Sequence, residues 1–260
     1  MNLTSTARVK AYLGITSSGS DTAIDQLIAR VSDQVIRWCS RPFLRTTYSG
    51  VFLNGTGSQI MRLPDSPIIS LSSVILGGSN GTTLSESADG NAAGYQYDDK
   101  YLYLFGGYLF PMGHRNIVVS YVAGFNATQD EFVPAAPGPY TVTPTDYGYA
   151  MVDQGVTYTV AGTALTKVGS APAVGQYTFS AGVYTFAAAD AGVSMTMDFD
   201  YSPGAVEQAV MEMCGADLKQ RDNLGISSKT LRDESISYSD KAMSNSVVGL
   251  LMPYKKILPL

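Results

Sequence analysis

The chain has 260 residues, of which 45% are hydrophobic and only 15% are charged. This composition, with 10% aromatic residues, excludes an intrinsically disordered chain, and the abundant glycine and tyrosine favour strands and tight turns. The net charge of −5 comes without the basic stripe of a typical nucleic-acid-binding protein. The sequence also lacks the run of about 18 apolar residues that a membrane-spanning helix requires, so we expect no membrane association.

The first 45 residues have helical periodicity. We expect a short helix over residues 6–13, capped by Thr4 or Ser5 and ended by Gly14. A second helix is predicted over residues 20–40, where Thr22 and Asp25 have the spacing of a capping box. Its apolar residues recur every three or four positions and form one stripe, which faces a core: Ile24, Leu27, Ile28, Val31, Val35 and Trp38.

Residues 46–125 have the pattern of strands. Two strands, 47–53 and 59–63, flank Asn54-Gly55 and predict a hairpin. A second hairpin is predicted from 95–97 and 101–105, with Asp98-Asp99 in its turn. Two further strands are expected at 68–76 and 116–122.

Short alternating strands separated by turn residues fill residues 137–202, which is typical of a small β-sandwich or barrel. This module contains one basic residue, Lys167, and five acidic residues: Asp146, Asp153, Asp190, Asp198 and Asp200. We therefore predict an α+β protein, with a helical core and a small antiparallel β-element in residues 1–136 and 203–260. An all-β, sandwich-like module is inserted at 137–202.

After the module, Ser202 and Pro203 predict the start of a helix over residues 203–223. Residues 226–245 are polar and weakly patterned, and residues 247–258 are again rich in apolar side chains. Because an apolar run left in water usually marks a partner surface, we expect residues 226–260 to form an interaction arm. The alternative is that residues 247–258 fold back on their own domain.

The sequence shows no set of residues with the spacing of a catalytic, cofactor or metal site. The single histidine, His114, has no acid or base close in sequence, so we interpret it as a loop or interface residue. Cys39 and Cys214 are predicted to be buried hydrophobic residues in helices. The adjacent carboxylates Asp98 and Asp99 are expected to form a turn, not a carboxylate pair. We therefore expect a protein that is not an enzyme and needs no cofactor.

Several segments, in order, resemble the head–tail connector (adaptor, head-completion) proteins of tailed bacteriophages. The N-terminal part of the resemblance is Leu3-Thr4, then residues 9–15, residues 21–31 and the Cys-Ser-Arg-Pro-Phe run at 39–43. The C-terminal part is residues 205–210, the run 219–229 and Glu234-Ser-Ile-Ser-Tyr238. The strand that ends in Tyr-Val-Ala-Gly-Phe at 121–125 also resembles the family, but there the last helix follows almost directly. In this sequence the module at 137–202, which we expect to be Ig-like, separates that strand from the last helix.

The resemblance implies a virion protein at the head–tail interface, assembled in the host cytoplasm. Family members form a ring, typically twelvefold, beneath the portal protein, extend the DNA channel after DNA packaging and offer a docking surface to tail or tail-completion proteins. Double-stranded DNA would pass through without sequence-specific binding. We assign residues to these contacts as candidates: Val247, Leu250, Leu251, Tyr254, Lys255 and Lys256 for portal binding, and Arg30, Arg37, Lys219 and Arg221 for the ring interface.

Three other functions stay open at this point. A tail-completion or terminator protein would occupy another ring position and bind the tail tube. A carbohydrate-binding phage adhesin is suggested by the β-module and the 17 tyrosines. A polysaccharide hydrolase would need two carboxylates about 5–10 Å apart in a cleft, which a sequence cannot show.

Overall fold

The computed structural model describes residues 2–220, 228–231, 234–237 and 243–256. It is mostly β, with 38% strand and 24% helix, so the predicted helical core with a small β-element is wrong. The chain forms two compact units: residues 1–40 with 128–255, and residues 41–127 with 256–260. The strands of the second unit have a core of their own, which is why they are not an accessory to the helices.

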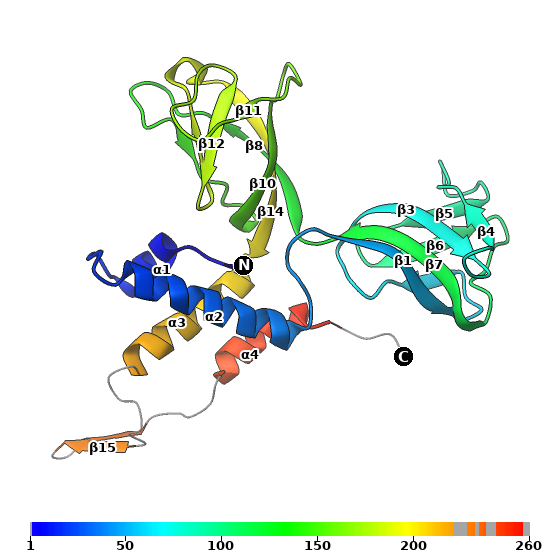
Figure 1. Cartoon of the computed structure of the whole chain (residues 1–260), viewed down its shortest axis with the longest axis horizontal. Helices are drawn as coiled ribbons and strands as arrows, with labels where there is room; N and C mark the ends of the chain where they lie inside the picture. The colour runs from blue at the N-terminus through cyan, green and yellow to red at the C-terminus, as the bar shows by residue number, and fades with distance from the viewer. Residues whose placement is uncertain (1, 221–227, 232–233, 238–242, 257–260) are drawn as a thin grey trace. The chain divides into compact units, whose positions relative to one another are not determined.

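The helices of the first unit match the predicted ones closely (Figure 1). Helix α1, Thr6–Leu13, is capped by Ser5 and ends at Gly14, whose φ of 69° suits glycine. Helix α2, Asp21–Cys39, buries the predicted stripe apart from Trp38, which is half-buried. The next residue, Cys39, is buried as well. The capping box is wrong, because Ser20 is the N-cap residue and Thr22 lies inside the helix.

Helix α3, Gly204–Gln220, begins directly after strand β14. Ser202 is therefore in a strand and does not cap the helix as predicted. The apolar side of α3 is buried in Val206, Val210, Met213 and Cys214. Helix α4, Asn245–Leu251, packs against α3 and continues into the 3₁₀ turn η3, Met252–Tyr254.

Two sheets complete the larger part of the first unit. One has the order β10–β14–β8, with β10 at Gly148–Tyr158, β14 at Ser194–Pro203 and β8 at Asn126–Phe132. The other has the order β11–β12–β13–β9, from Thr166–Lys167, Gln176–Ser180, Val183–Phe186 and Thr141–Val142; the 3₁₀ turn η1, Ala188–Asp190, follows β13. A hairpin of β15, Ser228–Leu231, and β16, Glu234–Ser237, lies between α3 and α4 in the sequence.

The sheet β10–β14–β8 crosses the module boundary predicted at residue 137, because β8 precedes that boundary. The strands expected within 137–202 are otherwise present. Residues Ala181 and Gly182 connect β12 to β13 with positive φ values of 48° and 83°, as a two-residue hairpin turn requires. The division into a connector core and an inserted module stays a prediction.

The second unit consists of two antiparallel sheets over one core. The first has the order β1–β7–β3–β4, from Thr46–Gly55, Gly113–Ala123, Ile68–Leu76 and Thr82–Leu84. The second has the order β2–β6–β5, from Ile60–Arg62, Tyr101–Phe105 and Gly94–Tyr97. Both sheets contribute buried side chains to the same cluster, among them Leu102, Phe110, Ile117, Val119 and Tyr121.

One of the two predicted hairpins of this unit is confirmed. Strands β5 and β6 pair across the Asp98 turn, where one Asp98 carboxylate oxygen accepts hydrogen bonds from the backbone N–H groups of Lys100 and Tyr101 at 2.7 Å each. The hairpin around Asn54-Gly55 is wrong. Strand β1 pairs with β7, and β2 pairs with β6, so the two strands lie in different sheets.

Candidate functional site

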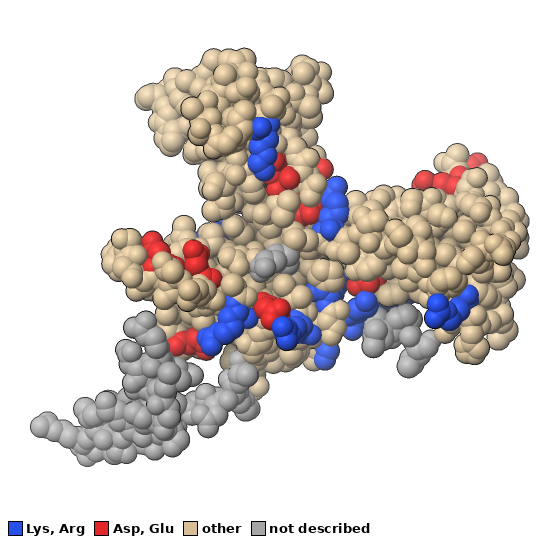
Figure 2. Space-filling view, in the orientation of Figure 1, with Lys and Arg blue, Asp and Glu red and all other residues tan. Residues whose placement is uncertain are grey.

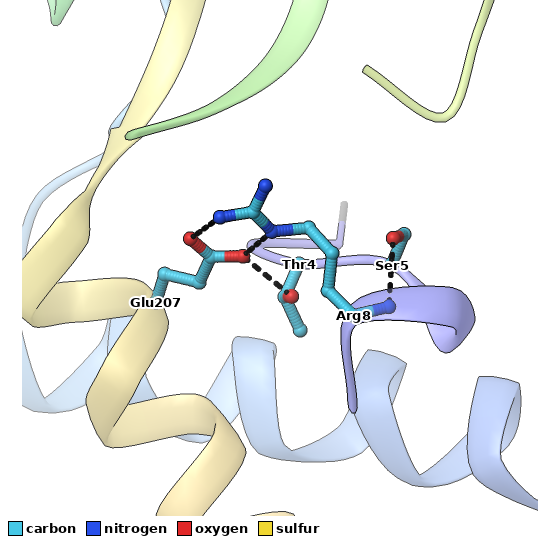
Figure 3. Close-up of polar contacts among 4 residues, drawn as sticks. All are labelled: Thr4, Ser5, Arg8 and Glu207. Carbon is cyan, nitrogen blue, oxygen red and sulfur yellow. Dashed lines mark hydrogen bonds and ion pairs between the residues drawn. The ribbon is translucent and has the colours of Figure 1, made fainter. Parts of the chain in front are cut away.

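A buried ion pair joins the N-terminal segment to α3 (Figure 3). The guanidinium of Arg8 contacts Glu207 through two nitrogens, with Nη2 donating to Oε2 at 2.8 Å. Thr4 Oγ1, which is fully buried, donates to Oε1 of the same carboxylate at 2.9 Å. The side chain of Glu207 is 3% exposed and that of Arg8 is 39% exposed. A bidentate ion pair of this kind restrains the relative orientation of its two side chains in addition to pairing their charges. We therefore infer that it holds α1 on α3.

The sequence does not predict this ion pair, because 199 positions separate Arg8 from Glu207. Glu207 has the position of an ordinary acidic residue in the first turn of a helix, where it complements the helix dipole. Its burial shows a second role. The guanidinium of Arg8 also lies 5.9 Å from the centre of the Tyr149 ring, which connects the pair to strand β10. Burial, with a contribution from Glu207, raises the pKa of Tyr149.

The ring-interface candidates on α2 both form ion pairs within the chain. Arg30 Nη2 lies 2.6 Å from an Asp217 carboxylate oxygen of α3, and Arg37 Nε lies 2.9 Å from Asp33 one turn away. Their side chains are nevertheless 69% and 79% exposed, so a neighbouring molecule could still contact them. Lys219 lies at the end of α3, and Arg221 lies outside the described residues. Their assignment to a ring interface stays a prediction.

Charged side chains are not spread evenly over the molecule. On the face drawn in Figure 2, basic and acidic side chains alternate over the helical part, whereas the sheets present mostly uncharged side chains. Arg30 and Arg37 belong to the helical part, and their side chains are exposed.

The portal-binding candidates divide into buried and accessible residues. Val247 and Leu251 are 2% and 0% exposed, so the expectation that the apolar C-terminal run lies in water is wrong for these two. They are buried where α4 packs against α3, and Ser246 Oγ donates to Glu212 Oε2 at 3.2 Å beside them. Leu250 and Tyr254 are half-buried. The described part of residues 243–255 thus folds back on its own unit, as the alternative proposed. The parts of the expected arm at 226–227, 232–233, 238–242 and 257–260 lie outside the described residues.

The two lysines that follow also have contacts within the chain. Lys255 Nζ lies 5.0 Å from the centre of the Trp38 ring, in a cation–π arrangement. Lys256 Nζ lies 2.8 Å from Oδ2 of Asp65, whose side chain is 7% exposed. Lys256 therefore compensates a buried carboxylate, and this explains its position better than a surface contact does. Portal binding by either lysine stays a prediction.

Asp65 also affects two stacked tyrosines in the second unit. The rings of Tyr48 and Tyr121 are 4.9 Å apart and 19° from parallel. Burial, strengthened by the negative charge of Asp65, raises the pKa of Tyr48 to about 12 and raises that of Tyr121 as well. Both hydroxyls therefore keep their protons above the pH at which an exposed tyrosine ionises.

Most carboxylates of the acidic module point inward. Asp153 accepts a hydrogen bond from the Tyr177 hydroxyl at 2.8 Å and lies 3.0 Å from Lys167 Nζ. Asp190 accepts from Tyr158 at 2.8 Å, and Asp200 accepts from the Gln154 amide at 3.0 Å. The sequence does not predict the burial of these carboxylates, because their hydrogen-bond partners lie more than 20 positions away in the chain. The high tyrosine content indicated only that hydroxyl donors are available.

The other residues singled out in the sequence are not brought together. His114 is exposed at the start of β7, and Cys39 and Cys214 are buried in different helices and are not joined by a disulfide. Burial raises the pKa of the Cys214 thiol to about 12, so this thiol is a poor nucleophile. Among the described residues there is no group of three or more metal-ligating side chains, and no helix is long and apolar enough to cross a bilayer.

Comparison with known proteins identifies no family. No protein-family model matches the chain, and no curated protein matches it. Among solved structures, the chain is similar to a chain in the neck of an empty GTA particle, computed with C6 symmetry. The sequence identity is 10%, the match covers 98% of this chain and 90% of that one, and the TM-score is 0.34. A TM-score this low supports no argument about fold or function.

Proposed function

We propose that this chain is a structural adaptor of a tailed-bacteriophage head–tail connector. It would form a ring under the portal protein, extend the DNA channel and present a docking surface to the tail. The observation that carries the proposal is the ordered set of connector-like segments at both ends of the sequence. The N-terminal set covers residues 9–15, 21–31 and 39–43, and the C-terminal set covers 205–210, 219–229 and 234–238.

The packing of these segments supports the proposal. Helices α1, α2 and α3, which carry most of the connector-like residues, contact one another within one unit. Each of the long helices buries an apolar side and leaves charged residues accessible, among them Arg37 on α2. A ring subunit needs a core of its own and, besides it, accessible surface for a neighbouring subunit.

The described C-terminal residues refine the proposed portal contact. Because Val247 and Leu251 are buried against α3, the apolar candidates still accessible to the portal would be Leu250 and Tyr254, next to the two lysines. Truncation of the chain after residue 225 would uncover the apolar side of α3, so a loss of portal binding could then reflect misfolding. Point substitutions of half-buried residues avoid that problem.

The deciding experiment is negative-stain electron microscopy of the purified protein, alone and mixed with the portal protein of the same phage. We expect rings that stack coaxially on the portal. Leu250→Ser should weaken the portal complex, whereas Val160→Ser in the module should not, because Val160 is 97% exposed and distant in sequence from the C-terminal segment. A protein that forms no ring and binds tail tube, or binds a glycan array through its module, would contradict the proposal.

A further inference from the structure

Strand β1 leaves a long unpaired edge in the second unit. It spans ten residues, Thr46–Gly55, at the end of the sheet order β1–β7–β3–β4. Within the described residues it pairs with β7 alone. Edge strands usually carry charged side chains or proline, which prevent pairing with another chain, and β1 has neither. Its pairing with β7 is irregular between Tyr48 and Val51 and between Leu53 and Gly55, so the regular edge that can accept a further strand is Val51–Leu53.

Apolar side chains surround the C-terminal end of this edge. Phe52, Ile60 and Met112 are 41%, 50% and 82% exposed. Phe52 and Ile60 line a surface hollow of about 320 Å³, together with Leu53, Asn54, Thr56, Met61 and Arg62. The side chain of Met112 lies next to Gly57, the residue that follows Thr56 of the hollow in the chain. We call Phe52, Ile60, Arg62, Met112 and Arg115 the β1 patch.

The β1 patch carries two positive charges without a compensating carboxylate. The guanidinium of Arg115 lies 4.7 Å from the centre of the Phe52 ring, and Arg62 lines the hollow. Neither forms an ion pair with any residue that the structure describes. A partner that fits this surface should therefore present an apolar side chain next to carboxylates.

Strand β8 has this chemistry at another sheet edge. It is the terminal strand of the sheet β10–β14–β8, and it ends in Asp130, Glu131 and Phe132. Phe132 is 70% exposed. Asp130 accepts a hydrogen bond from the Thr196 hydroxyl, and Glu131 accepts one from the Gln129 amide, both at 2.6 Å. These donors are neutral, and neither carboxylate forms an ion pair within the described part of the chain.

We propose that the β1 edge of one copy of this chain binds the β8 edge of a second copy, with Phe132 in the hollow of the β1 patch. Asp130, which lies on the same face of β8 as Phe132, would then face Arg62 and Arg115, and Glu131 would add negative charge at the end of the strand. Because the charged residues lie near the C-terminal end of both strands, this match requires the two strands to run parallel. The two edges differ, so the contact is head-to-tail and generates a closed ring when the rotation between copies closes. The inference rests on the proposed ring-forming function and names the contact that builds the ring.

Charge reversal tests the contact directly. One variant carries Arg62→Glu and Arg115→Glu, and the other carries Asp130→Arg and Glu131→Arg. Each alone should weaken self-association at least tenfold in analytical ultracentrifugation. An equimolar mixture of the two variants should assemble again, because each opposes a reversed surface with its complement. Asp146→Arg, which reverses an exposed charge in the loop before β10, is the matched control and should assemble like the wild type.

A second measurement detects the contact even if the charge pairs are weak. With Phe52→Cys and Phe132→Cys in one chain, mild oxidation should produce disulfide-linked oligomers, because Cys39 and Cys214 are both buried. Rings that form equally well in all variants, without disulfide-linked oligomers, would overturn the β1–β8 contact and leave the adaptor function standing. A wild-type protein that stays monomeric with and without portal would overturn both.

Discussion

Replacement of Arg8 by alanine should destabilise the first unit through the carboxylate that it leaves behind. The side chain of Glu207 is 3% exposed, and in the variant Thr4 would be its one remaining partner among those described. Removal of one member of a buried ion pair costs roughly 3–5 kcal/mol. Because the side chain of Arg8 is 39% exposed, water can partly replace it, and we expect about 2–3 kcal/mol. At about 2–4 °C per kcal/mol, the melting temperature should fall by about 4–12 °C.

The assay is thermal unfolding followed by circular dichroism at a helical wavelength. Arg37→Ala is the matched control, because its ion pair with Asp33 is 79% and 57% exposed and should contribute no more than about 0.5 kcal/mol. The double variant Arg8→Met with Glu207→Leu removes both charges and should recover most of the loss. If Arg8→Ala melts with the control, or if the double variant is no better than the single one, the buried carboxylate is not the cause.

Three further predictions concern burial and protonation. Leu27→Asp and Val31→Asp should each unfold the helical part, because Leu27 and Val31 are 9% and 1% exposed and an unpaired buried charge costs several kcal/mol; near-wild-type melting would refute the α2 assignment. Stability should be constant at neutral pH and fall as the pH rises above about 9. In the folded protein Tyr48 and Cys214 have pKa values of about 12, whereas in the unfolded chain they lose their protons near pH 10.0 and 9.0. Melting curves across pH 7–12 measure this loss of stability. Tyr48→Phe should make the melting of the second unit less sensitive to high pH. A thiol reagent such as DTNB should label neither Cys39 nor Cys214 in the native protein and both in denaturant, and rapid native labelling would contradict their burial.

The sequence determined the elements whose signals are local. The bounds of α1 and the apolar stripe of α2 follow from local side-chain patterns, and Gly14 marks the end of α1, whereas the choice between Thr4 and Ser5 as the N-cap came from the structure. The turn between β5 and β6 follows from Asp98, whose carboxylate bonds to the backbone two and three residues later. These interactions join residues a few positions apart, so a pattern in the sequence is enough to identify them.

Only the tertiary structure decided which strands pair and which polar groups are buried. Asn54-Gly55 has a hairpin signal, yet β1 gains more partners from β7, which lies some 60 residues away and is held there by the core of the second unit. The spacing of Val247 and Leu251 is compatible with a contact to the portal and with a contact to α3. In the structure α4 packs against α3, and both residues are buried. Glu207 and Asp65 look like surface carboxylates until Arg8 and Lys256 reach them across 199 and 191 positions. A buried charge needs a partner, and for these two carboxylates the partner comes from a distant segment of the chain. Such pairs form only when the whole fold brings the segments together.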